Sequence, residues 1–216
     1  MLIACWSPKG GTGTTVVSAA LALVLAPAGP TLLADLAGDV PAALGLSGSE
    51  GPGLSDWLAA GPDVPGDALS RLEVEVGPRL HLLPRGLGDA DTADPGRASA
   101  LASALAADRR CVVADCGRAA GGPGLVLAAG ASVSLLVLRP CYLALRRAQL
   151  APIRPSGVVL VGERGRSLTR RDVEEVLGVP VRAEVPHEPA VARAVDAGLL
   201  ATRVPRNLER SLRSAA

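Results

Sequence analysis

The sequence predicts an α/β fold of three layers, in which a doubly wound, mainly parallel sheet lies between helices. Short apolar runs of strand length alternate with longer runs rich in alanine and leucine along the whole chain, as in repeated strand–helix units. Three apolar runs end in residues suited to phosphate or metal: a glycine-rich loop after Trp6, and the carboxylates Asp35 and Asp115. Ligands of such sheets bind beyond the carboxyl ends of the strands, so we expect these groups to lie at one edge.

Composition restricts the class of protein. The chain has 216 residues, of which 49% are hydrophobic and 1% aromatic, and its formal net charge is +1. We expect a single domain over residues 1–216 with a core of leucine, valine and alanine. The small net charge argues against a globally basic nucleic-acid binder. The four cysteines form no C-x-x-C pair, and no signal peptide or membrane span is predicted, so we expect a cytoplasmic protein with reduced thiols.

The first elements are a strand over Leu2–Trp6, a loop over Ser7–Thr15 and a helix over Val16–Ala26. This order is the context of a phosphate-binding loop, because glycines let successive N–H groups point inward and a helix N-terminus attracts an anion. The Thr15 hydroxyl, at the second helical position, is predicted to hold Mg²⁺. A glycine-rich turn that binds nothing is the simpler alternative. The residues predicted to contact a nucleotide here are Lys9, Gly10, Gly11, Thr12, Gly13, Thr14 and Thr15.

Lys9 is the only lysine among 22 lysine and arginine residues. A composition so biased to arginine indicates that position 9 requires an ammonium group, which suits a phosphate in a tight loop better than a guanidinium fork does. The motif G-x-x-x-x-G-K-[ST] places its lysine at the position of Thr14. The chain therefore lacks the lysine that reaches the β- and γ-phosphates.

Two further strands end in acids, Thr31–Asp35 and Cys111–Asp115. The second is typical of a Walker B strand, whose acid reaches Mg²⁺ through water, so Asp115 joins Thr15 as a predicted metal-site residue. Asp35 is expected at the same edge of the sheet. A helix N-cap or loop acid is the alternative interpretation of Asp35.

The remaining elements follow from periodicity and punctuation. Trp57 lies on a short amphipathic helix, where packing in the core or at a dimer face is favoured over a ligand platform. His81 is expected to be a hydrogen-bonded core histidine. The spacing predicts an edge strand or hairpin arm at 72–76, core strands at 80–84, 132–138, 157–161 and 179–185, and helices at 96–107, 142–150 and 167–177.

Residues 198–216 are predicted to form a C-terminal helical tail, in which leucines alternate with arginines. A basic amphipathic helix can lie on an anionic membrane. Pro205 divides this tail, however, and its second half contains only two leucines. Packing of the tail against the domain is therefore favoured over peripheral membrane contact.

These motifs resemble the MinD/ParA superfamily of P-loop ATPases with a deviant Walker A loop. The resemblance covers the whole chain and rests on the lysine directly before the glycine pair at 10–11, the strands ending in Asp35 and Asp115, and the Leu-Gly-Val-Pro stretch at 177–180. Residues 39–46 and 53–58 look closest to its CpaE/TadZ-like branch. The resemblance implies ATP and Mg²⁺ as cofactors.

The resemblance also implies residue roles. Members dimerise face to face, and Lys9, as the signature lysine, would reach the phosphates of the partner subunit. Lys9 and Asp35 would serve in catalysis, and Pro186 and His187 would lie beside the nucleotide base. The family has a second acid where this chain has Ala37, so Thr14 and Ala37 imply weak or absent ATP hydrolysis.

Members of the superfamily are positioning switches for pili, septa, chromosomes or plasmids. The resemblance therefore implies a nucleotide-dependent homodimer with protein partners of a polar, septal or pilus machinery, recruited to the pole or septum. Two alternatives stay open: a pseudo-ATPase scaffold that works without nucleotide, and a ParA-type partition protein that binds DNA nonspecifically. The arginines available to DNA, or simply to solvent, are Arg146, Arg147, Arg164, Arg166, Arg170 and Arg171.

Overall fold

The structure, a computed structural model, describes residues 1–216 except 47–50, 62–63, 89–93, 163–164 and 216. Its described strands form one eight-stranded sheet in the order β3-β4-β2-β5-β1-β6-β7-β8. Every neighbouring pair is parallel except the edge hairpin of β3 and β4. The strands are β1 Leu2–Ser7, β2 Thr31–Asp35, β3 Val74–Gly77, β4 Leu80–Leu83, β5 Cys111–Arg118, β6 Val133–Leu138, β7 Gly157–Gly162 and β8 Val181–Pro186.

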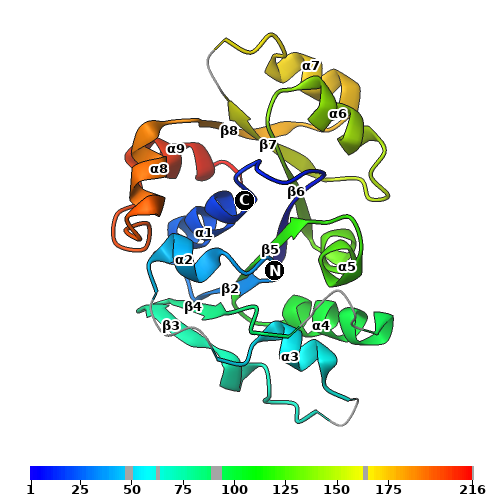
Figure 1. Cartoon of the computed structure of the whole chain (residues 1–216), viewed down its shortest axis with the longest axis vertical. Coiled ribbons are helices and arrows are strands. Elements are labelled where there is room, and N and C mark those ends of the chain that lie inside the picture. Colours follow the sequence, from blue (N-terminus) through cyan, green and yellow to red (C-terminus); the bar gives the residue numbers. More distant parts are fainter. Residues whose placement is uncertain (47–50, 62–63, 89–93, 163–164, 216) are drawn as a thin grey trace.

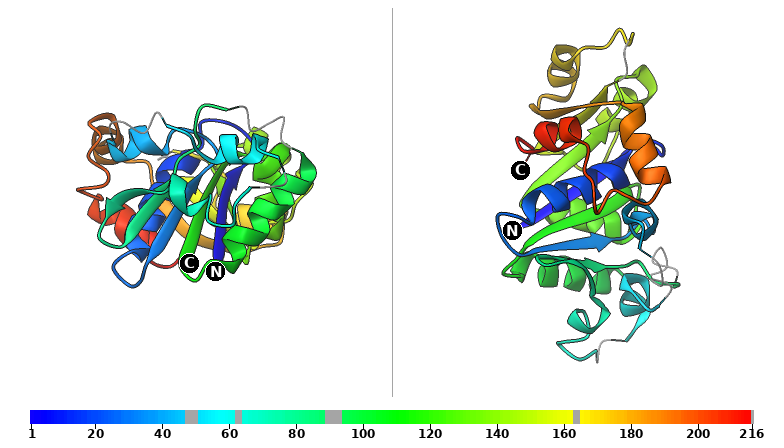
Figure 2. Two further views of the ribbon diagram at one scale, coloured as in Figure 1. Left: turned by 90° about the horizontal axis from the view of Figure 1, so that it is seen from below. Right: turned by 90° about the vertical axis from the view of Figure 1, so that its left-hand side faces the viewer.

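Helices cover both faces of the sheet, which confirms the predicted three layers (Figures 1 and 2). One face carries α1 Thr14–Leu25, α2 Val40–Leu44, α8 Pro189–Asp196 and α9 Arg206–Leu212. The other face carries α3 Leu54–Ala59, α4 Pro95–Ala107, α5 Gly122–Gly130, α6 Tyr142–Gln149 and α7 Arg170–Leu177. A short 3₁₀ turn, Ser70–Leu72, precedes β3.

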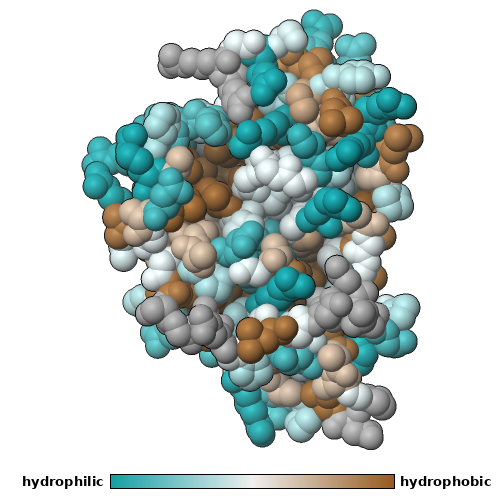
Figure 3. Space-filling model, in the orientation of Figure 1, coloured by the Kyte–Doolittle hydropathy of each residue, from teal (hydrophilic) through white to brown (hydrophobic). Residues whose placement is uncertain are grey.

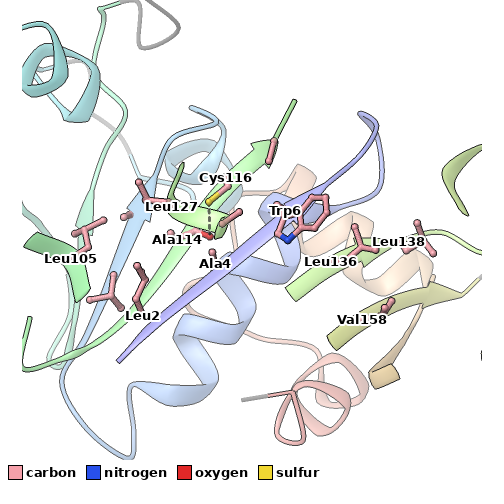
Figure 4. Close-up of a cluster of buried hydrophobic side chains, with 14 of the residues drawn as sticks. Leu2, Ala4, Trp6, Leu105, Ala114, Cys116, Leu127, Leu136, Leu138 and Val158 are labelled. Atoms are coloured by element: carbon pink, nitrogen blue, oxygen red, sulfur yellow. Dashed lines mark hydrogen bonds between the residues drawn. The ribbon is translucent and has the colours of Figure 1, made fainter. Parts of the chain in front are cut away.

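The central strand β1 divides its side chains between two cores. Leu2, Ala4 and Trp6 face the α4–α5 side, whereas Ile3 and Cys5 face α1, and none of the five is exposed. This alternation is the two-residue period of a strand buried on both faces. Figure 4 shows Trp6 on one side of the sheet among leucines of β6. The carboxyl end of β1, where the glycine loop begins, is therefore fixed by packing on both faces of the sheet.

Helix α9 packs against β8 and α1. Its apolar residues Leu208 and Leu212 are buried, as is Leu200 before it. The prediction that the tail packs against the domain is confirmed, and the leucines of α9 do not form an exposed face. Within the ranges given above, no helix has both the length and the apolar character needed to cross a membrane. That residues 1–216 form a single domain stays a prediction.

Most predicted elements are confirmed, with differences at three helices and one strand. Helices α2, α5 and α8 were not predicted. In α5, three glycines and Pro123 give low helix propensity, but Leu127 and Ala128 are buried, so packing overrides propensity. Strand β5 continues past Asp115 to Arg118. Trp57 packs partly buried against the core, with the Arg97 guanidinium 3.7 Å from its ring centroid.

Candidate phosphate and metal site

The loop between β1 and α1 has the backbone of a phosphate cradle. Gly11 and Gly13 have φ values of +75° and +90°, a left-handed region that favours glycine. A Cβ added at Gly10, Gly11 or Gly13 would meet no atom within 4 Å, so the loop borders open space at all three. Helix α1 begins after Gly13, and the first N–H groups of a helix have no partner within it. The loop therefore offers N–H donors next to open space.

The threonines of the loop differ in role. The hydroxyls of Thr12 and Thr14 are hydrogen bonded to each other at 2.9 Å, and both residues are buried. Thr14 therefore bonds inside the loop and adds no charge to it. Thr15 is the second residue of α1, as predicted, and is partly exposed. Lys9 is also partly exposed, and its side chain forms no ion pair with any described residue.

Asp115 lies at the centre of this edge of the sheet. Its strand pairs it with Cys5 on one side and with Asp35 on the other. Its Oδ1 accepts a hydrogen bond of 3.1 Å from the Gly117 N–H. Its Oδ2 is buried and has no hydrogen-bond partner among the described residues. Leaving a buried carboxylate oxygen unpaired is costly, so this atom indicates a polar ligand.

The electrostatics of Asp115 agree with its geometry. Burial raises the pKa of Asp115 to about 7, the Thr15 hydroxyl lowers it, and the neighbouring Asp35 carboxylate raises it further. A cation beside Oδ2 would favour the charged form. The carboxylate is therefore placed where a positive charge would be strongly held.

These residues fit a magnesium ion that arrives with a nucleotide. Within the described ranges, no group of three or more His, Cys, Asp and Glu residues is positioned to hold a metal. Mg²⁺ does not need such a cage, since it keeps several waters and binds through one or two protein oxygens and the phosphates. Thr15 and Asp115 fit that pattern of donors.

Asp35 is fully engaged by its own loop. Its Oδ1 accepts hydrogen bonds from the N–H groups of Ala37 and Gly38 at 2.9 and 2.6 Å, and its Oδ2 accepts one from Val40 at 3.1 Å. Burial raises the pKa of Asp35, and these hydrogen bonds oppose the rise. The structure thus shows the loop-acid role given above as the alternative. A catalytic role of Asp35 stays a prediction.

Ala37 lies close to the end of β5. A Cβ added at Gly117, whose φ is +54°, would lie 3.1 Å from the Ala37 Cβ. The Ser7 hydroxyl donates to the carbonyls of both Lys9 and Gly117, at 3.0 and 3.2 Å. The phosphate loop and the segment after Asp115 are therefore tied together.

Pro186 and His187, the two residues predicted to lie beside the nucleotide base, are at the end of the edge strand β8. Pro186 ends β8, and the His187 N–H donates to the Gly162 carbonyl at 2.7 Å. Both side chains are exposed, and β6 and β7 lie between β8 and β1. They share the carboxyl edge of the sheet with the loop, and their contact with a base stays a prediction.

The arginines available to DNA lie near α6 and α7, which pack on each other. Arg146 and Arg147 are exposed and form no ion pair with described residues. Arg170 is engaged: it pairs with Glu174 at 3.1 Å and donates to the Val181 carbonyl at 2.7 Å. Arg164 lies outside the described residues. Hydrophilic residues over α6 and α7 are mixed with hydrophobic ones on the face shown in Figure 3.

Two arginines near the site had no predicted role. Arg85 directly follows Pro84 at the end of β4, and Arg118 ends β5. Both line a cavity of about 230 Å³ beside Ala37 and Gly117. The signal in the sequence is that each follows a core strand, because the carboxyl ends of parallel strands meet at one edge.

Comparisons with known proteins identify the fold. No protein-family model matches the chain, and no curated protein matches its sequence. A ParA-family ATPase from Chlorobium tepidum TLS is 21% identical with a TM-score of 0.76, covering 98% of this chain and 96% of that one. The septum site-determining protein MinD from Pyrococcus horikoshii, complexed with Mg-ADP, is 22% identical with a TM-score of 0.78, covering 99% and 93%.

McdA from Cyanothece, solved as a variant in complex with ATP, is 16% identical with a TM-score of 0.76, and the match covers 99% of this chain and 94% of that one. The three similar structures span nearly the whole chain, and the sheet and its helices match theirs. The chain therefore has the three-layer P-loop fold of the MinD and ParA-family ATPases.

Proposed function

We propose that this protein is an ATP-binding, dimerising positioning switch of the MinD/ParA type. The observation that carries the proposal is the buried Asp115 Oδ2 without a partner among the described residues, next to an open glycine loop. Two proteins of the same fold are complexed with Mg-ADP and with ATP. A nucleotide with its metal is the ligand that fits all three observations.

Each residue of the site has a defined task in this proposal. The N–H groups of the loop and of the α1 N-terminus bind the phosphates. Thr15, through its hydroxyl, and Asp115, through its carboxylate, would hold Mg²⁺. Bound Mg²⁺ supplies charge neutralisation for the phosphates. Lys9 extends to the phosphates of a second subunit, and this contact makes dimerisation depend on ATP.

Weak or absent hydrolysis is part of this proposal. Thr14 is bonded to Thr12 and offers no positive charge to the β- and γ-phosphates. Ala37 has no carboxylate to orient an attacking water. Each loss raises the barrier by about 3 kcal/mol, on the scale of removing one stabilising group from an active site. The molecule then acts through binding and release of nucleotide more than through turnover.

The biological role proposed is septum-site or pilus localisation, as in the CpaE/TadZ-like branch, with recruitment to the pole or septum by protein partners. Support for it comes from the sequence of residues 39–46 and 53–58. The pseudo-ATPase scaffold is the second candidate. It is favoured by Thr14, which stands where the motif has its second lysine and whose hydroxyl is hydrogen bonded to Thr12.

Titration calorimetry with Mg-ATP tests the proposal. We expect a dissociation constant of about 1–100 μM for the wild type. Thr15→Ala should lose the Mg²⁺-dependent part of the affinity, whereas Thr202→Ala, an exposed threonine in the tail, should bind as the wild type does. No binding heat up to about 1 mM ATP would contradict the nucleotide switch and support the scaffold.

A further inference from the structure

A cavity of about 230 Å³ lies at the carboxyl edge of the sheet, between the ends of β2 and β5 and the start of α5. Ala37 and Gly117 line it, where the Ala37 side chain lies close to the Gly117 backbone. Its two charged lining residues are Arg85 and Arg118, and the lining includes no Asp or Glu. The cavity is therefore electropositive.

Neither guanidinium is neutralised by a residue that the structure describes. Arg85 and Arg118 form no side-chain ion pair or hydrogen bond with any described residue, and the Arg85 Nε is buried without a partner. Arg85 lies next to the Asp35 loop, since a Cβ added at Gly38 would be 3.2 Å from the Arg85 Cδ. A buried guanidinium N–H without a partner is costly, so the cavity is suited to an anion.

Two residues that line the cavity, Gly117 and Arg118, are tied to the start of the phosphate loop. Arg118 on β5 is paired with Ser7 on β1, and Ser7 lies two residues before Lys9 in the chain. Adjacent strands of a sheet are about 4.8 Å apart. The Ser7 hydroxyl joins the Lys9 and Gly117 carbonyls. The backbone of Arg118 therefore lies at the start of the phosphate loop, and the long Arg118 side chain can reach a phosphate bound there.

The loop itself is short of positive charge. Thr14 stands where a lysine would meet the β- and γ-phosphates, and its hydroxyl is bonded to Thr12. A triphosphate bound with Mg²⁺ keeps a net negative charge beyond the loop. An arginine can bind phosphate oxygens with two parallel N–H donors, so it can replace a lysine that the loop lacks.

We propose that Arg85 and Arg118 form the binding site for the terminal phosphate of a nucleoside triphosphate, in place of the lysine missing at Thr14. This inference rests on the proposed nucleotide function and adds a specificity to it. The two arginines distinguish ATP from ADP, because ADP has no phosphate at the cavity.

The test compares Mg-ATP and Mg-ADP binding by titration calorimetry. Arg118→Ala and Arg85→Ala should each weaken ATP binding by about 10- to 100-fold, the effect of losing a charged hydrogen bond, and change ADP binding by no more than about twofold. Arg109→Ala is the matched control, since Arg109 is exposed and lies at the opposite end of β5. Thr14→Lys in the Arg118→Ala background should restore ATP affinity.

The outcomes separate the two claims. If the wild type binds ATP and the arginine variants keep its preference over ADP, the inference is wrong and the proposed function stands. Equal losses of ATP and ADP affinity would also overturn it, because they indicate a structural role. If the wild type binds neither nucleotide, both claims fail.

Discussion

Replacing Asp115 by asparagine should make the ligand-free protein more stable at neutral and alkaline pH. The carboxylate is buried, one of its oxygens has no partner among the described residues, and Asp35 lies beside it on the neighbouring strand β2. Asparagine has nearly the same shape, and its carbonyl oxygen can still accept the hydrogen bond from the Gly117 N–H. The substitution therefore removes a buried charge and leaves the packing intact.

The magnitude follows from the pKa of Asp115. A folded-state pKa of about 7, against an ordinary value of 3.8, corresponds to an upper bound of about 4 kcal/mol. Below pH 3.8 the carboxyl is protonated in both states and contributes no penalty. As pH rises to about 7 only the unfolded state ionises, so stability falls. Above pH 7 the penalty is constant.

Urea denaturation of wild type and Asp115→Asn at pH 5 and pH 8, without nucleotide, measures this effect. The difference in the free energy of unfolding should favour the variant and be larger at pH 8, reaching about 1–4 kcal/mol. Addition of Mg-ATP should stabilise the wild type more than the variant. If Asp115→Asn is less stable than the wild type at pH 8, or if the difference in the free energy of unfolding does not change with pH, the buried Asp115 carboxylate does not destabilise the protein.

Other substitutions test the supporting structure by the same urea measurement. Asp35→Ala removes the acceptor of three backbone hydrogen bonds and should lower the free energy of unfolding by about 1–3 kcal/mol; no loss would mean that the loop holds without it. Trp6→Phe removes the indole N–H that donates to the Ser134 hydroxyl at 3.0 Å, and should cost about 1–3 kcal/mol, partly restored by Ser134→Ala. Leu212→Ala should cost about 2–5 kcal/mol, while Leu199→Ala, 48% exposed, should cost far less; equal small effects would show that the tail does not pack.

The sheet and its functional edge could be predicted because short-range patterns encode them. The runs before Asp35 and Asp115 are apolar on both faces, and the glycine loop follows Trp6 directly, so strand, loop and order are visible in the chain. In the structure, Asp35 on β2 is paired with Asp115 on the neighbouring strand β5. The position of Thr15 in α1 is confirmed for the same reason.

What could not be predicted depends on contacts between distant residues. Helix α5 forms despite its glycines, since Leu127 and Ala128 are buried. The hydrogen bond between Thr12 and Thr14, and the lack of a partner for the Asp115 Oδ2 among the described residues, depend on side-chain positions that the sequence does not show. The same holds for the cavity, which joins Arg85, after the end of β4, to residues of β5 that lie more than thirty positions further along the chain.

The central claim, a switch controlled by nucleotide, is tested most directly by sedimentation velocity with Mg-ATP, with Mg-ADP and without nucleotide. The wild type should be a monomer without nucleotide and with ADP, and a dimer with ATP. Lys9→Ala should remain monomeric in all three conditions, because the proposed contact to the partner's phosphates is lost. The same sedimentation coefficient of the wild type in all three conditions, or an ATP-dependent dimer of Lys9→Ala, would contradict a switch in which Lys9 makes dimerisation depend on ATP.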